Sequence, residues 1–268
     1  MAGPTMSLPI FYINLARDTE RRQKLEAELA RQGLQGTRFE AVWWANLGEA
    51  EQKQLYSAEL NKHQFHASLV NGEKGCYASH IRLWQQLLAS GAPAMVVLED
   101  DVGLKDGFAD ILGAISQRAQ PWDMVKLIGR ERDSFRGSCP LSEGVELVDY
   151  KRVPSMTAGY AISRQGAQKL CQSRLPFGRP IDVDLRYWWE NDLAVLGVSP
   201  AALVLDETSF TSSIGSQFAA VRLGHRWRQI KRQSAYILLS ARHNARPAPL
   251  LNYLCTPPTR TAPHTAAI

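Results

Sequence analysis

The stretch Ala94-Met95-Val96-Val97-Leu98-Glu99-Asp100-Asp101 decides the fold class of this 268-residue chain. Its apolar half is partly β-branched and lies between Pro93 and Gly103, which is typical of a buried central strand. Three carboxylates at the end of such a strand repel one another and resist burial. A divalent cation would relieve that repulsion, because Mg²⁺ and Mn²⁺ prefer oxygen ligands. A solvated acidic turn is the alternative interpretation.

Strands and helices are predicted to alternate around this run, which indicates an α/β fold. We expect one α/β domain with a mostly parallel central sheet flanked by helices, and ligands of such sheets bind beyond the carboxyl ends of the strands. The segment 129–155 predicts a loop or hairpin. Apolar runs predict further strands at 8–15, 37–42, 160–162, 124–128 and 202–205, and helical spacing predicts helices at 19–32, 49–60, 73–90, 164–172 and 182–191.

The sequence argues against several common classes of protein. It has no Gly-x-Gly-x-x-Gly after the first strand and no Walker-type loop, so we expect neither a dinucleotide oxidoreductase nor a nucleoside triphosphatase. Its four cysteines are widely spaced, which argues against a zinc site and a disulfide scaffold and favours free thiols in a reducing compartment. No run approaches the ~20 apolar residues of a membrane-spanning helix, and residues 1–8 show no secretory signal.

Charge is distributed unevenly along the chain. Eight Lys and Arg residues and no Asp or Glu follow Glu207, so residues 1–207 carry a net charge of −3 although the whole chain carries +5. The segment 216–246 mixes these cations with apolar residues, which predicts a basic amphipathic helical tail after a domain at 1–215. We expect this tail to contact an anionic membrane surface and not nucleic acid; packing on the domain is the alternative. Residues 247–268 are rich in Pro and predict disorder.

Six short motifs occur in a fixed order along residues 8–215. They are Tyr12-Ile13-Asn14-Leu15 with Arg21-Arg22; Arg38-Phe39-Glu40-Ala41-Val42; Gly72-Glu73-Lys74-Gly75-Cys76 with Ser79, His80 and Trp84; Leu98-Glu99-Asp100-Asp101-Val102; Thr157-Ala158-Gly159-Tyr160-Ala161-Ile162-Ser163; and Pro180-Ile181-Asp182. In these motifs the chain resembles glycosyltransferase family 25, which includes bacterial lipopolysaccharide and lipooligosaccharide galactosyltransferases and collagen galactosyltransferases. The resemblance implies a GT-A-like fold, a UDP-sugar donor, Mn²⁺ or Mg²⁺, and inversion at the anomeric carbon.

The acidic triplet is the predicted centre of the donor site. Asp101 is predicted to bind the metal directly, Asp100 to share in that role or support it, and Glu99 to bind the donor ribose or sugar. The other candidates each have a structural alternative, namely a solvated arginine, a core histidine or tight packing. The predicted donor-binding residues are Asn14, Arg21, His80, Glu99, Asp100, Thr157 and Gly159.

Two acids are candidates for the base that deprotonates the acceptor hydroxyl. Asp182 is preferred over Asp184, although an aspartate after Pro180 can also be a plain helix cap. Trp188 and Tyr160 are predicted to contact the acceptor sugar. The predicted reaction transfers galactose from UDP-galactose, in β linkage, to a terminal sugar of a lipopolysaccharide or lipooligosaccharide core, at the inner face of the cytoplasmic membrane. The alternatives are UDP-glucose or a UDP-N-acetylhexosamine as donor, or a non-catalytic protein that binds polyanions or membranes.

Overall fold

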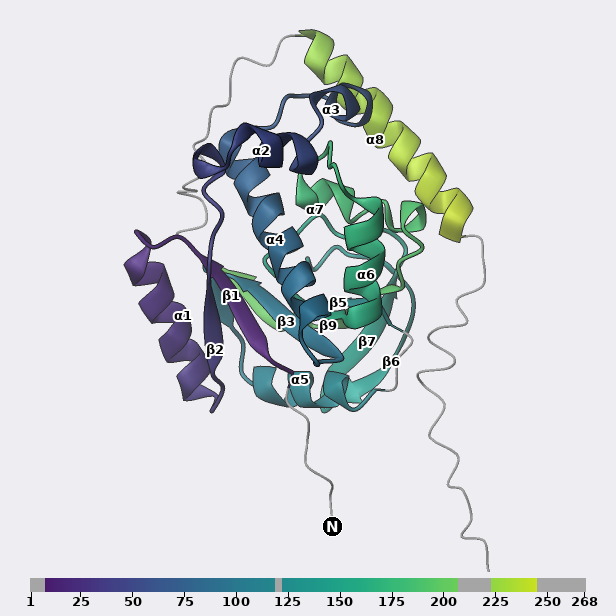
Figure 1. Ribbon diagram of the computed structural model, residues 1–268. Coiled ribbons are helices and arrows are strands. Elements are labelled where there is room, and N and C mark those ends of the chain that lie inside the picture. The colour runs from purple at the N-terminus through teal and green to yellow at the C-terminus, as the bar shows by residue number, and fades with distance from the viewer. Residues whose placement is uncertain (1–7, 119–121, 207–222, 245–268) are drawn as a thin grey trace, which may run out of the picture.

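A central sheet of eight strands organises the molecule, and the computed structural model describes residues 8–118, 122–206 and 223–244 (Figure 1). The strand order is β2-β1-β3-β8-β5-β9-β7-β6. Only β8 and β7 run opposite to the other strands of this sheet, so the sheet is mostly parallel in direction, as predicted. Its strands are β1 (Ile10–Asn14), β2 (Gly36–Glu40), β3 (Ala94–Glu99), β5 (Met124–Lys126), β6 (Phe135–Ser142), β7 (Val145–Tyr150), β8 (Gly159–Ser163) and β9 (Val195–Ser199).

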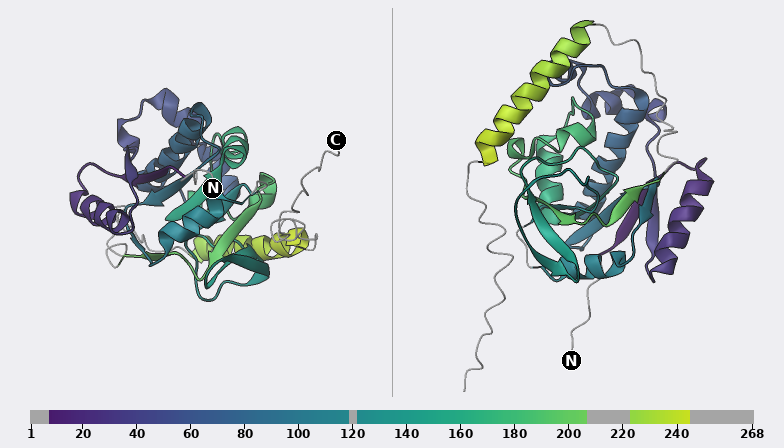
Figure 2. Two further views of the ribbon diagram at one scale, coloured as in Figure 1. Left: turned by 90° about the horizontal axis from the view of Figure 1, so that it is seen from below. Right: turned by 180° about the vertical axis from the view of Figure 1, so that it is seen from behind.

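Helices cover both faces of the sheet (Figures 1 and 2). Helices α1 (Thr19–Arg31) and α5 (Phe108–Ser116) pack on one face, and α4 (Asn71–Ala89), α6 (Arg164–Ser173) and α7 (Ile181–Asp184) pack on the other. A separate antiparallel pair joins β4 (Val102–Leu104) to β10 (Leu203–Leu205). The remaining elements are η1 (Trp44–Asn46), α2 (Glu49–Leu55), α3 (Ala58–Gln64), η2 (Trp188–Glu190) and α8 (Leu223–Asn244).

Strand β3 divides the apolar core in two, because side chains alternate between the faces of a strand. Met95 and Val97 pack in the cluster on the α4 face, and Val96 and Leu98 pack in the cluster on the α1 and α5 face. The same alternation continues past the apolar run. It directs Glu99 toward α4 and the next residue, Asp100, toward α1.

Helix α4 lies unusually close to the segment that follows β2. A Cβ atom on Gly75 would lie 2.4 Å from the carbonyl oxygen of Val42, so only glycine allows this approach. Ser79 Oγ accepts a hydrogen bond from the Val42 amide at 2.8 Å and donates to the Gly75 carbonyl at 2.8 Å. This contact brings the first turns of α4 to the end of β3.

Most predicted elements are confirmed, and the exceptions have local causes. The predicted helix at 49–60 is two helices, because Tyr56 is extended and the Ser57 side chain caps the second one by accepting from the Leu60 amide. The predicted helix at 182–191 is wrong: only the short α7 and η2 form there. Strand β9 and helix α5 were not predicted. Cys139 takes part in a disulfide, so the expectation of four free thiols is also wrong, although Cys76 and Cys171 are free.

The predicted basic tail contains a helix, α8, that packs on the domain near α3 (Figure 1) and contacts η2 through His243. Tyr236 and Ser240 are buried in this contact, and Arg232 donates to the carbonyls of Lys62 and His63 at 2.9 Å each. No helix in the described ranges is both long and apolar enough to span a bilayer. The predicted disorder of 247–268 concerns residues outside those ranges.

Candidate active site

The ends of β1 and β3 place an amide beside the acidic triplet. These strands are parallel neighbours, so Asn14 and Asp100 meet at the carboxyl edge of the sheet. Asn14 Nδ2 donates to Asp100 Oδ2 at 2.7 Å, and Arg38 Nε donates to Asn14 Oδ1 at 2.9 Å, which fixes the orientation of the amide. The Arg21 guanidinium lies 3.5 Å from the other Asp100 oxygen. The predicted residues Asn14, Arg21 and Asp100 are therefore brought together.

Glu99 points to the opposite face of the sheet and ends a chain of buried polar groups. Thr157 donates to Glu99 Oε1 at 2.7 Å, and His80 Nε2 lies 3.5 Å from the same oxygen. His80 Nδ1 lies 2.8 Å from the Tyr160 hydroxyl, to which Trp84 Nε1 donates at 2.9 Å. Burial alone would raise the pKa of Glu99, but the contacts with His80 and Thr157 lower it. Glu99 is therefore held as a carboxylate.

Asp100 and Asp101 are acids in a poorly solvated position. Burial raises the pKa of both carboxyls, and it raises that of Asp101 to about 6, with a further contribution from the negative charges of Glu99 and Asp100. A group of this kind gains from any cation that comes close, because the cation offsets both the lost solvation and the repulsion. The donor atoms are carboxylate oxygens, so the chemistry of this pair fits Mg²⁺ or Mn²⁺.

Two cavities meet at the acidic triplet. The first has a volume of about 530 Å³ and lies between the ends of β1 and β3, residues 41–45 and the first turns of α4. The second, of about 240 Å³, lies against residues 155–158 and 180–182. Cys76, Glu99 and Asp101 line both cavities. The first is within the size range of ligand pockets, roughly 300–1,000 Å³, and the shared wall gives two bound molecules a place to meet.

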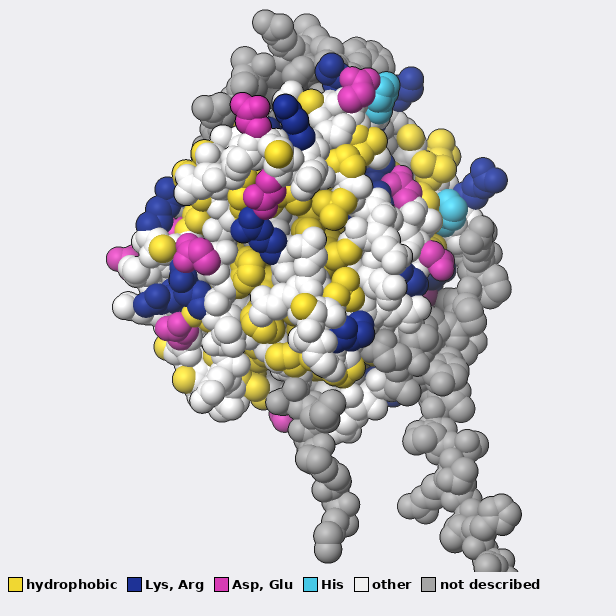
Figure 3. Space-filling model, in the orientation of Figure 1, with side chains coloured by type: hydrophobic (Ala, Val, Ile, Leu, Met, Phe, Trp, Pro, Cys, Tyr) yellow, Lys and Arg dark blue, Asp and Glu magenta, His cyan; other side chains and the backbone are white. Residues whose placement is uncertain are grey.

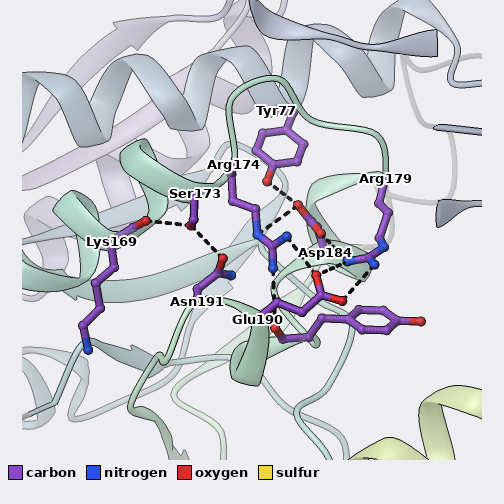
Figure 4. Close-up of polar contacts among 9 residues, drawn as sticks. Tyr77, Lys169, Ser173, Arg174, Arg179, Asp184, Glu190 and Asn191 are labelled. Carbon is purple, nitrogen blue, oxygen red and sulfur yellow. Dashed lines mark hydrogen bonds and ion pairs between the residues drawn. The ribbon is translucent and has the colours of Figure 1, made fainter. Parts of the chain in front are cut away.

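The two candidate bases lie on opposite sides of α7. Asp182 lines the second cavity, and burial raises its pKa to about 6. Asp184 is 1 % exposed and points into the core (Figure 4). There it accepts hydrogen bonds from the Tyr77 hydroxyl at 2.6 Å and from Arg179 at 2.8 Å. Asp182 is thus the candidate base, whereas the position of Asp184 suits a structural role.

An ion-pair network surrounds Asp184 and joins α7 to η2 (Figure 4); Arg174, Arg179 and Asp184 are buried in it, and Glu190 is partly exposed. Glu190 accepts from Arg174 at 3.0 Å and from both terminal nitrogens of Arg179 at 2.9 and 3.0 Å. The Arg179 guanidinium also stacks 3.9 Å from the centre of the Tyr187 ring. This network holds the backbone that carries Asp182.

Four predicted substrate contacts lie away from both cavities, and His80 is one of them, since it is fully buried and lines neither cavity. Tyr160 is 1 % exposed and bonds to His80 and Trp84. Trp188 packs against Trp189 and against His243 of α8. Gly159 serves close packing, because a Cβ atom there would lie 2.0 Å from a methyl group of Leu203. Thr157, which was also predicted to bind the donor, does line the second cavity.

Lys126, which was not predicted as a site residue, supports one wall of the second cavity. This lysine is 1 % exposed, and burial lowers its pKa to about 8. Its ammonium donates to the Pro154 carbonyl at 2.9 Å and also to the Met156 carbonyl. A lysine inside the apolar run 124–128 was the available signal, because lysine is almost never buried without partners. Trp43, which lies below the Arg17 guanidinium at the first cavity, was missed as well.

The motifs at these cavities belong to one family model, that of glycosyltransferase family 25 (LPS biosynthesis protein), which matches residues 7–185. The chain belongs to glycosyltransferase family 25. This match includes the acidic triplet, the first turns of α4 and Asp182. It confirms the resemblance on which the site was predicted.

Several curated members of family 25 are similar to this chain. Procollagen galactosyltransferase 2 of Homo sapiens is 31 % identical over 185 residues, covering 65 % of this chain and 29 % of the relative. Procollagen galactosyltransferase 1 of Danio rerio is 30 % identical over 230 residues, covering 77 % of this chain and 37 % of the relative. Inactive glycosyltransferase 25 family member 3 of Mus musculus is 28 % identical over 213 residues, covering 71 % and 36 %. The chain spans about a third of the length of these relatives, and one of them is named inactive.

Proposed function

We propose that this protein transfers a hexose from a UDP-sugar to a sugar of a lipopolysaccharide or lipooligosaccharide core, and that the preferred hexose is galactose. The observation that carries this proposal is the pair of cavities that share Glu99 and Asp101, with Asp182 in the smaller cavity. The galactosyltransferase names of two relatives support the donor sugar, and the description of the family model supports the acceptor class.

Each cavity has the chemistry of one substrate. The larger cavity offers Arg21, Asn14 and the first turn of α4 to a diphosphate, because guanidinium groups and helix N-termini favour phosphate. Asp182 in the smaller cavity accepts the proton of the acceptor hydroxyl while that oxygen attacks the anomeric carbon. Attack from the side opposite to the leaving UDP inverts that carbon and gives the proposed β linkage.

Asp101 and Asp100 are the proposed ligands of a divalent cation. Both are oxygen donors with raised pKa values, and Asp101 faces both cavities, so the pair suits Mn²⁺ or Mg²⁺. When bound, such a cation neutralises negative charge that develops on the departing diphosphate. Asn14 and Arg21 keep Asp100 in place through their own contacts with it.

Calorimetry of UDP-galactose binding, with and without Mn²⁺, tests this proposal. We expect binding that requires Mn²⁺, that falls by ~100-fold or more in Asp101→Asn (a loss of about 3 kcal/mol), and that is unchanged in Asp106→Asn, whose carboxylate is 96 % exposed. UDP-glucose and UDP-N-acetylhexosamines titrated in parallel identify the donor. A folded protein that binds neither UDP nor any of these sugars in the presence of Mn²⁺ would overturn the proposal in favour of a non-catalytic polyanion-binding protein.

We further propose that α8 holds the protein on an anionic membrane, at the cytoplasmic face. Tyr236 and Ser240 face the domain, whereas Ile230, Ile237 and Leu238 are 57 %, 41 % and 72 % exposed. Figure 3 shows apolar side chains beside basic ones along this helix. A helix with an apolar stripe and flanking cations is suited to the interface of an anionic bilayer.

Flotation with vesicles separates this membrane contact from its alternatives. We expect binding to phosphatidylglycerol vesicles at low salt, with loss of binding in Leu238→Glu. Gln233→Glu is the matched control, because it makes the same change of charge without removing an apolar side chain. Binding that is equal for both variants, or equal for neutral phosphatidylcholine vesicles, would refute the proposed apolar contact. Added salt should weaken the electrostatic contribution to vesicle binding.

A further inference from the structure

A thiol, an imidazole and a carboxylate come together at the wall that the two cavities share. Cys76 and His80 lie one turn apart on α4, and Glu99 ends β3. One potential ligand atom from each, sulfur, nitrogen and oxygen, lies within 4.8 Å of the others. Cys76 and Glu99 line both cavities, so a further position beside this cluster is open to a small molecule or water.

The Nε2 nitrogen of His80 points into this cluster. His80 is fully buried, and its Nε2 atom has no hydrogen-bond partner, with Glu99 Oε1 at 3.5 Å. Its other nitrogen, Nδ1, lies 2.8 Å from the Tyr160 hydroxyl, whose oxygen has lone pairs for both Trp84 and His80. Histidines that bind metals donate their second ring N–H in this way, which orients the ring.

Negative charge surrounds the Cys76 thiol. Burial raises the pKa of Cys76, and so do the nearby carboxylates of Glu99, Asp182, Asp101 and Glu73. Such an environment opposes a free thiolate but favours a thiolate that is paired with a divalent cation.

We propose that Cys76, His80 and Glu99 form a binding site for a thiophilic divalent cation of the Zn²⁺ class. Sulfur and imidazole ligands select such ions over Mn²⁺ or Mg²⁺, so this site is distinct from the hard oxygen site at Asp100 and Asp101. Zn²⁺ binds sulfur at about 2.3 Å and imidazole nitrogen at about 2.0 Å, so small side-chain rotations bring all three atoms onto one ion. The ion replaces the thiol proton, which leaves to solvent, and nothing is oxidised or reduced.

The spacing of the cysteines in the sequence does not indicate this site, because only one of its three ligands is a cysteine. The other two are a histidine on the same helix and a carboxylate at the end of β3. Occupancy has a consequence for the donor, since Glu99 is shared with the larger cavity. An ion that holds Glu99 withdraws that carboxylate from any ligand of this cavity.

Titration of the full chain with Co²⁺ tests the site without any measurement of activity. We expect a near-ultraviolet sulfur-to-cobalt charge-transfer band that saturates at one ion per chain, releases one thiol proton and disappears when Zn²⁺ is added. The band should be lost in Cys76→Ser and kept in Cys171→Ser, which removes the other free thiol described in the structure. It should also persist in Asp101→Asn, which removes the proposed hard ligand.

Two results would overturn the proposal: cobalt binding without the sulfur band, or a band that Cys76→Ser leaves unchanged. Circular dichroism shows whether that variant is folded. If it is not, Glu99→Gln decides the matter, since the band should remain while cobalt affinity falls by tenfold or more. Unchanged affinity in Glu99→Gln would refute the third ligand. Failure of UDP binding in the preceding experiment leaves this spectroscopic result unaffected.

Discussion

Replacing Asp182 by asparagine should raise stability and remove activity in the same variant. The Asp182 carboxyl has its pKa raised from 3.8 to about 6, mainly by burial. It therefore holds its proton more tightly in the folded than in the unfolded protein, and the free energy of unfolding falls as pH rises from about 4 to about 6. The shift corresponds to a cost of ~3 kcal/mol at neutral pH, at ~1.4 kcal/mol per pKa unit.

Asparagine keeps the size of the side chain and an oxygen that can accept from the Val183 amide, but it cannot ionise. We expect Asp182→Asn to raise the free energy of unfolding by ~1–3 kcal/mol at pH 8 and to change it little at pH 4, where the folded wild type is protonated at this carboxyl. Denaturant unfolding at several pH values measures this difference. Asp110→Asn, at an exposed acid on α5, is the control for the loss of a charge.

The activity of the same variant completes the test. Wild-type turnover should rise with pH through about 6, because the proposed base works only as a carboxylate, and Asp182→Asn should lose this activity. Full activity in Asp182→Asn would refute the assignment of the base. A stability difference that is the same at pH 4 and pH 8 would refute the electrostatic reasoning, whatever the activity.

Three further substitutions separate structural from functional roles. Asp184→Asn removes the buried carboxylate that Arg174 and Arg179 share and leaves both guanidinium groups only Glu190, so it should destabilise the fold by ~1–3 kcal/mol in thermal unfolding; a well-folded but inactive variant would contradict this role. Gly75→Ala should destabilise by ~1–3 kcal/mol, because its methyl group meets the Val42 carbonyl, whereas Gly113→Ala, with open space around it on α5, should be neutral or stabilising. Tyr160→Phe removes the hydroxyl that holds His80, so it should cost ~1–3 kcal/mol of stability and weaken UDP-sugar binding in calorimetry. Unchanged donor affinity would show that the position of Glu99 does not depend on the contacts between Tyr160, His80 and Glu99.

The spacing of apolar residues in the sequence was enough to predict the strand and the helix that line the larger cavity. The apolar run 94–98 and the spacing of Tyr77, Ile81 and Trp84 report local structure, and both β3 and α4 form there. The order of the strands was not predictable in this way. Strand β8 inserts between β3 and β5, and no local pattern states which strands become neighbours.

The sequence alone also could not decide whether Asp182 or Asp184 faces the cavity. The two acids are two residues apart, so on a helical turn they point to nearly opposite sides, and only the phase of that turn decides which one faces the cavity. The phase is set by contacts made in the fold, because Tyr77 of α4 and the nearby Arg179 both bind Asp184. Lys126 is a similar case, since its backbone partners at 154 and 156 are known only from the fold.

The two cavities draw on different halves of the chain. Residues 13–101 supply the described lining of the larger cavity, whereas residues 155–205 contribute most of the smaller one, and the residues common to both lie at positions 76–101. Such an arrangement allows one half to diverge while the other stays fixed. A chimaera that joins residues 1–104 of this chain to the second half of another family member should keep the nucleotide preference of the first parent and take the acceptor of the second.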